Sequence, residues 1–360
     1  MSASDTVLLT DYAWPDVAIE SAIIEGAGLR LVTGPAKPAS AEAIARLASE
    51  HQPVAIMTNW APVSAASIAA SSRLRIVTRL GVGLDNIAVD EATRRGIWVT
   101  NVPDYCLEEV SDHAVAMLLA WARGLMHFDR EVKAGRWEPA SARLHRARDL
   151  TCGLIGLGRT GRRTAQKLRA FDMRLLGHVR QPTNLPAAIL DGAERRPRWG
   201  EAQHEPSNLA TAGVEMTTLE ELLRSSDAVI VHLPLTSATR HLIDRERMAL
   251  MKPGAFLINV SRGAVLDTAA LIDALESGRL SGAALDVLED EPRVPPGLLR
   301  SNVILTPHIA FSSGASLREL RRKASEEVVR VLRGEPPEQA RNEPRSRPAM
   351  RPDLAAEQPS

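Results

Sequence analysis

A glycine-rich stretch near the middle of the chain has the spacing of a nucleotide-binding turn. Residues 153–161 read GLIGLGRTG, and the last six of them form Gly-x-Gly-x-x-Gly between an apolar run and a helical pattern. In that context Gly156 permits a tight turn, Gly158 lets the backbone approach a pyrophosphate, and Gly161 lets the helix pack on the strand. The N–H groups that begin the helix then face the phosphates. We therefore predict a dinucleotide cofactor; the alternative is an ordinary glycine-rich strand–helix turn.

The residues that follow the next apolar run bear on which dinucleotide binds. An acidic residue about 18 positions after Gly161 would hold the ribose hydroxyls of NAD, but the chain reads His178-Val179-Arg180 there. Val179 accepts no hydrogen bond, and the Arg180 guanidinium suits a 2′-phosphate, with His178 beside it. The sequence predicts NADP in preference to NAD, unless Arg180 points into solvent and NAD binds through its pyrophosphate.

Polar residues with catalytic potential follow other apolar runs. Hydride transfer to a ketone leaves an alkoxide that a histidine can protonate, a neighbouring carboxylate keeps that histidine protonated, and an arginine can bind a substrate carboxylate with two hydrogen bonds. On residue chemistry alone, His232 and His308 compete for the role of acid. Four polar stretches each follow an apolar run that we read as a strand: His232-Leu-Pro234-Leu-Thr236, Asn259-Val260-Ser-Arg262-Gly, Asp286-Val-Leu-Glu-Asp-Glu291-Pro and Thr306-Pro-His308.

Two alternating series of apolar and helical segments must position these residues. The alternation predicts two α/β domains with parallel sheets, each doubly wound and Rossmann-like. A long helix is expected near residues 107–125, and a last helix at residues 314–332. The predicted strands are residues 7–10, 29–33, 54–58, 74–78 and 97–100 in the first series, and 151–155, 173–179, 228–232, 255–259, 282–286 and 303–306 in the second.

The length, charge and cysteine content of the chain exclude several classes of protein. With 360 residues, two domains are expected, and 44 basic against 44 acidic residues argue against a protein that coats nucleic acid. The two cysteines are far apart, and neither a signal peptide nor a membrane-spanning run is recognisable, so we expect a cytoplasmic protein without membrane contact. We expect no metal site. Residues 181–213 are read as an insertion, which is either a mobile surface loop or a functional segment, namely a flap over the adenosine end of the cofactor or an inter-subunit arm. The Pro- and charge-rich residues 334–360 are read as a disordered tail.

The chain closely resembles the family of D-isomer-specific 2-hydroxyacid dehydrogenases. The resemblance extends over roughly residues 5–333, apart from 181–213. Residues 103–137 and 310–315 are also similar to the bacterial branch related to C-terminal-binding proteins. The matching stretches are residues 79–86 (RLGVGLDN), 153–161, 233–236, 258–266, 283–292 and 305–309.

The resemblance implies roles for individual residues. His308 becomes the proton donor, Glu291 its carboxylate partner and Arg262 the substrate-binding arginine, while His232 falls on the adenine side. Substrate would bind to Arg262, His308 and the backbone of Leu80, Gly81, Val82 and Gly83. The implied cofactor-binding residues are Gly156, Gly158, Arg159, Thr160, Gly161, Val179, Arg180, His232, Pro234, Thr236, Val260, Arg262 and Asp286.

The resemblance also implies an organisation and an activity. Residues 1–102 and 307–333 would form the substrate domain, and residues 103–306 the dinucleotide-binding domain. The helix after Pro103 would contribute to a homodimer interface, although its apolar face (Val110, Ala114, Met117, Leu118, Trp121) could instead be intramolecular core. Thr160 and Phe311 depart from the usual pattern.

The expected activity is reversible reduction of a small 2-oxo acid, such as glyoxylate or hydroxypyruvate, to a D-2-hydroxy acid with a nicotinamide cofactor. The alternative is a nucleotide-sensing, corepressor-like interaction protein with little turnover.

Overall fold

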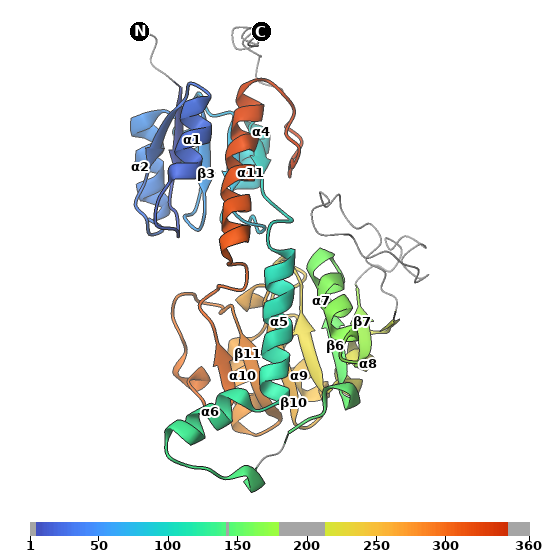
Figure 1. Ribbon diagram of the computed structural model, residues 1–360. Helices are drawn as coiled ribbons and strands as arrows, with labels where there is room; N and C mark the ends of the chain where they lie inside the picture. The colour runs from blue at the N-terminus through green and yellow to red at the C-terminus, as the bar shows by residue number, and fades with distance from the viewer. Residues whose placement is uncertain (1–4, 142–143, 180–212, 345–360) are drawn as a thin grey trace. The chain divides into compact units, whose positions relative to one another are not determined.

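A computed structural model describes residues 5–141, 144–179 and 213–344 of the chain (Figure 1). Its internal contacts divide the chain into two compact units. Unit 1 contains residues 1–105 and 313–360, and unit 2 contains residues 106–312. Both units are built on parallel sheets, as the alternating pattern predicted. Within the described ranges, no helix combines the length and the apolar character that a membrane crossing needs.

Unit 1 is a five-stranded parallel sheet in the order β2-β1-β3-β4-β5. Strands β1, β3 and β4 are buried along their whole length, because helices cover both faces of the sheet and so favour continuous apolar runs. The strands are β1 (Thr6–Leu9), β2 (Arg30–Thr33), β3 (Ala55–Thr58), β4 (Ile76–Arg79) and β5 (Trp98–Thr100), and the helices are α1 (Ala18–Gly26), α2 (Ala41–His51), α3 (Ala65–Ala69), α4 (Val89–Arg94) and α11 (Gly314–Leu332).

The last helix of the chain belongs to unit 1. Ser313 caps α11 in a reciprocal capping box with Ser316, which fixes where the helix begins. The helix then packs along α1 (Figure 1). Between them Arg321 donates to both carboxylate oxygens of Glu20, whose side chain is fully buried. This ion pair joins segments that are 301 residues apart in the sequence.

Part of the predicted disordered tail is ordered. The Arg341 N–H donates to the carbonyl of Val99 over 2.8 Å, and Asn342 accepts from the Val99 N–H over 2.8 Å. Residues 340–342 therefore pair with β5, and this part of the predicted tail is ordered. The physical reason is that β5 is an edge strand with unpaired backbone groups that a polar segment can satisfy. Residues 345–360 lie outside the described residues.

Unit 2 is a seven-stranded parallel sheet in the order β12-β11-β10-β9-β6-β7-β8. The chain leaves β6 toward β7 on one side and returns to β9 on the other, so the order reverses at β6, where such sheets bind ligands. The strands are β6 (Thr151–Ile155), β7 (Arg174–His178), β8 (Val214–Met216), β9 (Ala228–Val231), β10 (Ala255–Asn259), β11 (Leu280–Leu285) and β12 (Val303–Leu305). The helices are α5 (Leu107–Ala122), α6 (Leu125–Lys133), α7 (Arg159–Arg169), α8 (Leu219–Ser225), α9 (Arg245–Leu250) and α10 (Thr268–Glu276).

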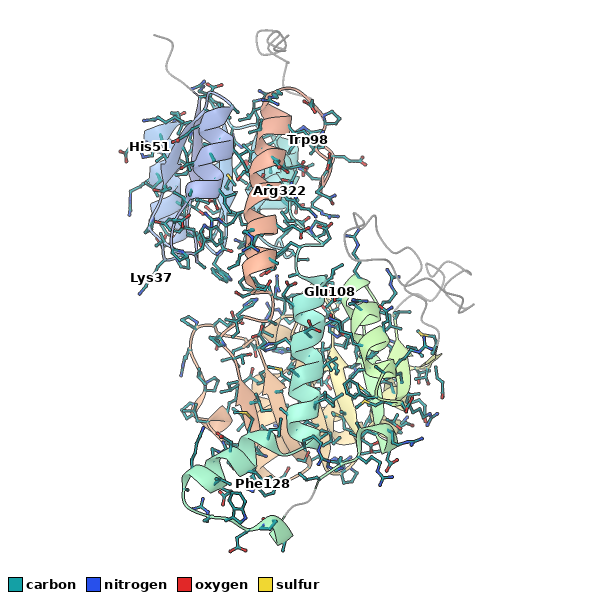
Figure 2. The ribbon with its side chains drawn as sticks, viewed as in Figure 1. Lys37, His51, Trp98, Glu108, Phe128 and Arg322 are labelled. Atoms are coloured by element: carbon teal, nitrogen blue, oxygen red, sulfur yellow. The ribbon has the colours of Figure 1, made fainter. Side chains whose placement is uncertain are left out.

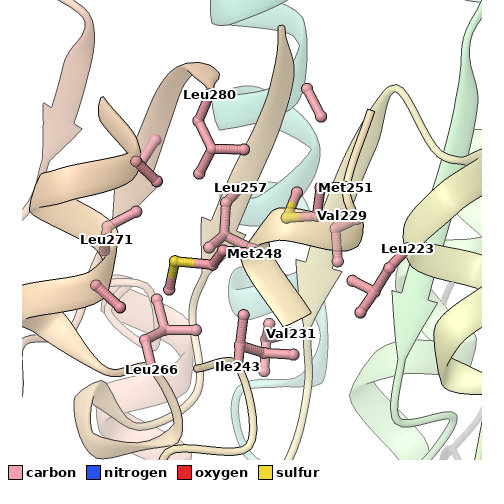
Figure 3. Close-up of a cluster of buried hydrophobic side chains, with 14 of the residues drawn as sticks. Leu223, Val229, Val231, Ile243, Met248, Met251, Leu257, Leu266, Leu271 and Leu280 are labelled. Carbon is pink, nitrogen blue, oxygen red and sulfur yellow. The ribbon is translucent and has the colours of Figure 1, made fainter. Parts of the chain in front are cut away.

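Successive residues of the central strands supply two separate cores. Leu154 and Ile230 belong to the core under α5 and α7, whereas Ile155, Val229 and Val231 belong to the core under α8, α9 and α10. Figure 3 shows the second core, where strand side chains meet those of the covering helices. Because side chains alternate between the faces of a strand and both faces are buried, these strands read as unbroken apolar runs.

Three features of unit 2 differ from the predicted elements. The helix predicted over residues 107–125 ends at Ala122, and a second helix, α6, starts after Gly124, whose φ of 61° breaks the first. Strand β8 follows the predicted insertion and was not predicted. The insertion itself, except Gly213, lies outside the described residues.

Candidate active site

The glycine turn joins β6 to α7 at the centre of the sheet of unit 2. Gly156 has a φ of +95°, and a Cβ added there would lie 2.5 Å from the His232 carbonyl oxygen. A Cβ on Gly161 would lie 2.0 Å from the Gly156 carbonyl oxygen. Both positions therefore exclude side chains, as the motif predicts, and the turn packs directly against the end of β9.

The N-terminus of α7 fits a phosphate group. Gly158 occupies the N-cap position without a side-chain cap, and a Cβ added there would meet nothing within 4 Å. The first N–H groups of a helix need an acceptor, and the helix dipole favours an anion at this end. Arg159 and Thr160 are the first two residues of α7. A dinucleotide pyrophosphate meets these requirements.

His232, which follows β9, is not suited to act as the acid. Its Nε2 is buried without a hydrogen-bond partner among the described residues, and burial lowers the pKa of His232 to about 4. The imidazole is consequently neutral near pH 7. A buried polar atom without a partner beside the glycine turn suits a ligand, consistent with the cofactor-side position that the resemblance implies.

The remaining predicted cofactor residues lie at strand ends of unit 2. In the loop after β9, Thr239 donates to the Pro234 carbonyl over 2.6 Å and accepts from the Thr236 N–H over 2.8 Å. At the end of β7, His178 Nδ1 lies 3.2 Å from the Thr217 carbonyl oxygen, so Nδ1 is the donor. Val179 packs against the core beside α5 and α7, and Val260 is buried in it. Arg180 lies outside the described residues.

A histidine–carboxylate pair forms where β12 ends. His308 Nδ1 and Glu291 Oε2 are 2.8 Å apart, and Glu291 Oε1 accepts from the Leu288 N–H over 2.9 Å. Burial raises the pKa of Glu291, but the hydrogen bond and charge of His308, the Leu288 N–H and the charge of Arg262 together hold it below its ordinary value. An ionised Glu291 thus orients the His308 ring through Nδ1, and proton exchange between Nε2 and a substrate stays a prediction.

Asp286 holds the turn that carries His308. Its buried carboxylate accepts from the Thr306 hydroxyl over 2.6 Å and from the N–H groups of Ile309 and Ala310 over 2.9 and 3.0 Å. The His308 N–H donates to the Asp286 carbonyl over 2.8 Å, while His308 itself has a φ of +54°. Asp286 therefore has a structural role; its implied position near the nicotinamide stays a prediction.

Arg262 lies in the loop after β10. The Asn259 side chain fixes this loop, because its amide donates to the Arg262 carbonyl over 2.9 Å and its oxygen accepts from the Ser261 N–H over 3.0 Å. A Cβ on Gly263 would lie 1.9 Å from the Leu288 carbonyl carbon. The Arg262 loop thus packs against the backbone of the loop that carries Glu291, and unit 2 brings Arg262, Glu291 and His308 together.

The predicted substrate-binding loop belongs to unit 1, where it follows β4. The Leu80 N–H donates to the Thr58 carbonyl over 2.7 Å, and the Gly81 carbonyl accepts from the Val102 N–H over 3.1 Å. Val82 is 46% exposed. The buried side chain of Arg79 stabilises this loop, because its guanidinium donates a hydrogen bond to the Leu80 carbonyl. That support was not predicted. Substrate binding by Leu80, Gly81, Val82 and Gly83 stays a prediction.

Comparison with known proteins shows the family to which the chain belongs. A model of the D-isomer specific 2-hydroxyacid dehydrogenase NAD-binding domain matches residues 115–196 and 198–310. Glyoxylate reductase of Pyrococcus furiosus is 41% identical over 273 residues, which are 74% of this chain and 75% of that protein.

Solved structures give the same picture for the fold. D-lactate dehydrogenase from Aquifex aeolicus, complexed with NAD and lactic acid, superposes with a TM-score of 0.76 at 29% identity, covering 91% of this chain and 96% of that one. An NADPH-dependent glyoxylate/hydroxypyruvate reductase from Sinorhizobium meliloti, complexed with NADP and malonate, gives 0.74 at 29% identity, covering 93% and 96%.

These findings confirm the predicted fold class and the predicted use of a nicotinamide cofactor, and they make the chain an oxidoreductase rather than a corepressor-like sensor. The placement in the branch related to C-terminal-binding proteins stays a prediction. The chain belongs to the family of D-isomer-specific 2-hydroxyacid dehydrogenases.

Proposed function

We propose that this enzyme reversibly reduces glyoxylate, hydroxypyruvate or a similarly small 2-oxo acid, with His308 as the proton donor. The observation that carries the proposal is the 2.8 Å contact between His308 Nδ1 and the Glu291 carboxylate, beside the loop of Arg262. A protonated imidazole held by a carboxylate is suited to protonate an alkoxide as it forms. The substrate size is inferred from the glyoxylate reductases among the relatives.

Glu291, His308 and Arg262 each have one task in the proposed reaction. Glu291 keeps the imidazole protonated and turned so that Nε2 delivers the proton to the carbonyl oxygen, and His308 becomes neutral as the alcohol forms. Arg262 binds the substrate carboxylate with two parallel hydrogen bonds, which places the carbonyl carbon for attack. The nicotinamide, when bound, supplies the hydride that reduces that carbon. In the reverse direction His308 accepts the hydroxyl proton.

The residues that would hold the cofactor form a continuous series along the strand ends of unit 2. The N–H groups at the start of α7, with Arg159 and Thr160, would bind the pyrophosphate. Pro234 and Thr236 would contact the adenine side, where His232 offers its unpaired ring nitrogen. Val260 and Asp286 would lie toward the nicotinamide.

We further propose a preference for NADP. Val179, where β7 ends, is apolar, so nothing there repels a 2′-phosphate or attracts the ribose hydroxyls of NAD. The next residue, Arg180, supplies a guanidinium by sequence. Both cofactors occur among the relatives: the Sinorhizobium enzyme uses NADPH, and the Aquifex enzyme was solved with NAD. The test compares kcat/KM with NADPH and NADH in the wild type and in Val179→Asp/Arg180→Ala. We expect NADPH to be preferred in the wild type and the ratio to fall at least ~10-fold in the variant, about 1.4 kcal/mol.

The reaction is tested with a panel of 2-oxo acids graded by side-chain size, followed through the absorbance of the reduced cofactor. We expect glyoxylate and hydroxypyruvate to have the highest kcat/KM. His308→Gln should lower kcat at least ~100-fold, the usual scale for loss of a general acid. Wild-type turnover in His308→Gln would exclude His308 as the proton donor.

The predicted homodimer has a second candidate surface besides the apolar face of α5. Ala114, Met117 and Leu118 of that face are buried in the core of unit 2. Apolar side chains are exposed on the segment of residues 125–141 and 144, which we call the arm. The arm starts with α6, a helix without a buried residue. The exposed apolar residues of the arm are Leu125, Met126, Val132, Trp137 and Leu144.

We propose that this arm binds a second copy of the chain. It borders a hollow of about 300 Å³ that Phe128, Val132, Trp137 and Leu144 help to line. Figure 2 labels Phe128 on helix α6. An exposed apolar surface of this kind marks an interaction site, and a two-fold dimer would pair the same surface on both copies. Light scattering after size exclusion should give twice the chain mass for the wild type and the monomer mass for Val132→Glu/Trp137→Glu. A monomeric wild type would refute the proposal.

A further inference from the structure

His113 connects helix α5 to the turn that carries His308. Its Nε2 lies 3.0 Å from the Thr306 hydroxyl oxygen and 3.7 Å from Asp286 Oδ1. The Thr306 hydroxyl uses its single proton in the 2.6 Å bond to Asp286 Oδ1. It must therefore accept from His113, which fixes Nε2 as the protonated ring nitrogen. The chain of donors runs from His113 through Thr306 to Asp286.

The far end of this chain is the backbone around His308. The Asp286 carboxylate also accepts from the N–H groups of Ile309 and Ala310. Its hydrogen bonds therefore hold residues before and after His308. His308 has a φ of +54°, a backbone conformation that residues other than glycine adopt only when the surrounding structure imposes it. A change in the orientation of the carboxylate would move the His308 ring relative to Glu291.

Helix α5 is a rigid support for His113. Lys167 of α7 donates to the Glu108 carbonyl over 2.9 Å and to Asp112 over 2.6 Å, next to His113. Arg163 of α7 also pairs with Glu108, over 2.7 Å. The turn of α5 that bears His113 is thus fixed to the helix that follows the glycine turn.

We propose that His113 is a positioning residue for His308, acting through Thr306 and Asp286. The Thr306 hydroxyl can rotate. Because its oxygen accepts a hydrogen bond from His113, its own proton points toward Asp286. Without His113 the turn keeps the two backbone bonds to the carboxylate, so the fold persists, but the third bond loses its direction. The proposal rests on the proposed role of His308 as proton donor.

Substitutions at His113 test whether the donated hydrogen bond is what matters. His113→Phe keeps a planar ring but cannot donate, whereas the amide of His113→Gln can. His51→Phe is the matched control, because the His51 side chain is 24% exposed, against 23% for His113, and it lies in unit 1. We expect kcat to fall about tenfold in His113→Phe, to stay within about threefold of the wild type in His113→Gln, and to be unchanged in His51→Phe. The cofactor Kd, from quenching of tryptophan fluorescence, should change less than about twofold in all three.

A double-variant cycle tests the route. Thr306→Val removes the hydroxyl with little change in shape. If His113 acts through Thr306, the double variant is no slower than the slower single variant, within about twofold. Multiplying effects, or a wild-type kcat in His113→Phe, would overturn the proposal.

The proposed role of His308 is separated by its own variant. If His308→Gln turns over at the wild-type rate, the proton-donor assignment fails and this inference fails with it. If His308→Gln is inactive while His113→Phe is as active as the wild type, only the role of His113 is refuted. Folding of each variant is checked by its thermal midpoint, which should stay close to that of the wild type for His113→Gln.

Discussion

Replacing Glu291 by glutamine changes one charge and almost no volume in the active site. The side chain can still accept from the Leu288 N–H, as Oε1 does over 2.9 Å in the wild type. What disappears is the negative charge on the oxygen 2.8 Å from His308 Nδ1. His308 then loses the negative charge that holds and orients its ring, so proton donation to the substrate becomes less favourable.

The size of the effect follows from the geometry and the exposure of the pair. Unit charges about 4 Å apart attract by about 4 kcal/mol at an effective dielectric constant of about 20. The side chains of His308 and Glu291 are 26% and 36% exposed, so solvent screens much of this energy. A remaining coupling of roughly 1–1.5 kcal/mol corresponds to about a tenfold change in rate.

The assay is kcat for 2-oxo acid reduction at saturating substrate and cofactor. We expect kcat to fall about tenfold in Glu291→Gln. Asp290→Asn is the matched control, since it removes the neighbouring charge on an exposed side chain of the same loop. A wild-type kcat in Glu291→Gln, or an equal loss in Asp290→Asn, would refute the assignment of Glu291 as the partner of His308.

Three further predictions concern the packing and charge of both units. Gly263→Ala should lower kcat/KM by at least ~10-fold, because the added Cβ would lie 1.9 Å from the Leu288 carbonyl carbon and force the two catalytic loops apart; steady-state kinetics measures this. Arg321→Met should destabilise unit 1 by roughly 3–5 kcal/mol, because it strands a fully buried Glu20 carboxylate, and Glu20→Met/Arg321→Met should recover most of the loss; thermal midpoints of both variants decide. Because burial lowers the pKa of His232 from 6.5 to about 4, the unfolded chain binds its proton first as the pH falls. Stability should drop by about 2 kcal/mol between pH 7 and pH 5, and His232→Gln should remove this dependence of the denaturation midpoint.

The sequence predicts the fold well where burial is complete. Strands β6, β9 and β10 are buried on both faces, so their apolar runs stand out from their surroundings. The helix α11 has the predicted limits, and Ser313 caps its first turn with a side-chain acceptor. Where local chemistry and tertiary burial agree, periodicity and capping residues are sufficient.

Contacts between distant segments had no such signal. The His113–Thr306 hydrogen bond joins residues 193 apart, and the Arg321–Glu20 pair joins residues 301 apart. His113, Glu20 and Arg321 each read alone as an ordinary polar residue on a helix, and the Thr306-Pro-His308 run does not indicate which residue Thr306 contacts. The pairing of Arg341 with β5 was hidden in the same way, because a Pro- and charge-rich composition indicates poor core formation but does not exclude backbone hydrogen bonds to an edge strand.

The choice between His232 and His308 shows where the limit lies. Both follow parallel strands at the ligand-binding edge of one sheet, so strand position alone could not separate them. The sheet order decides their neighbours: β9 lies beside β6, which places His232 against the glycine turn, whereas β12 lies beside β11, which places His308 next to the loop of Glu291. Burial lowers the pKa of His232, whose Nε2 has no hydrogen-bond partner among the described residues, whereas a carboxylate oxygen lies 2.8 Å from His308 Nδ1. The same side chain therefore suits a cofactor contact at one strand end and proton donation at another, and what separates the two roles is the neighbouring strand.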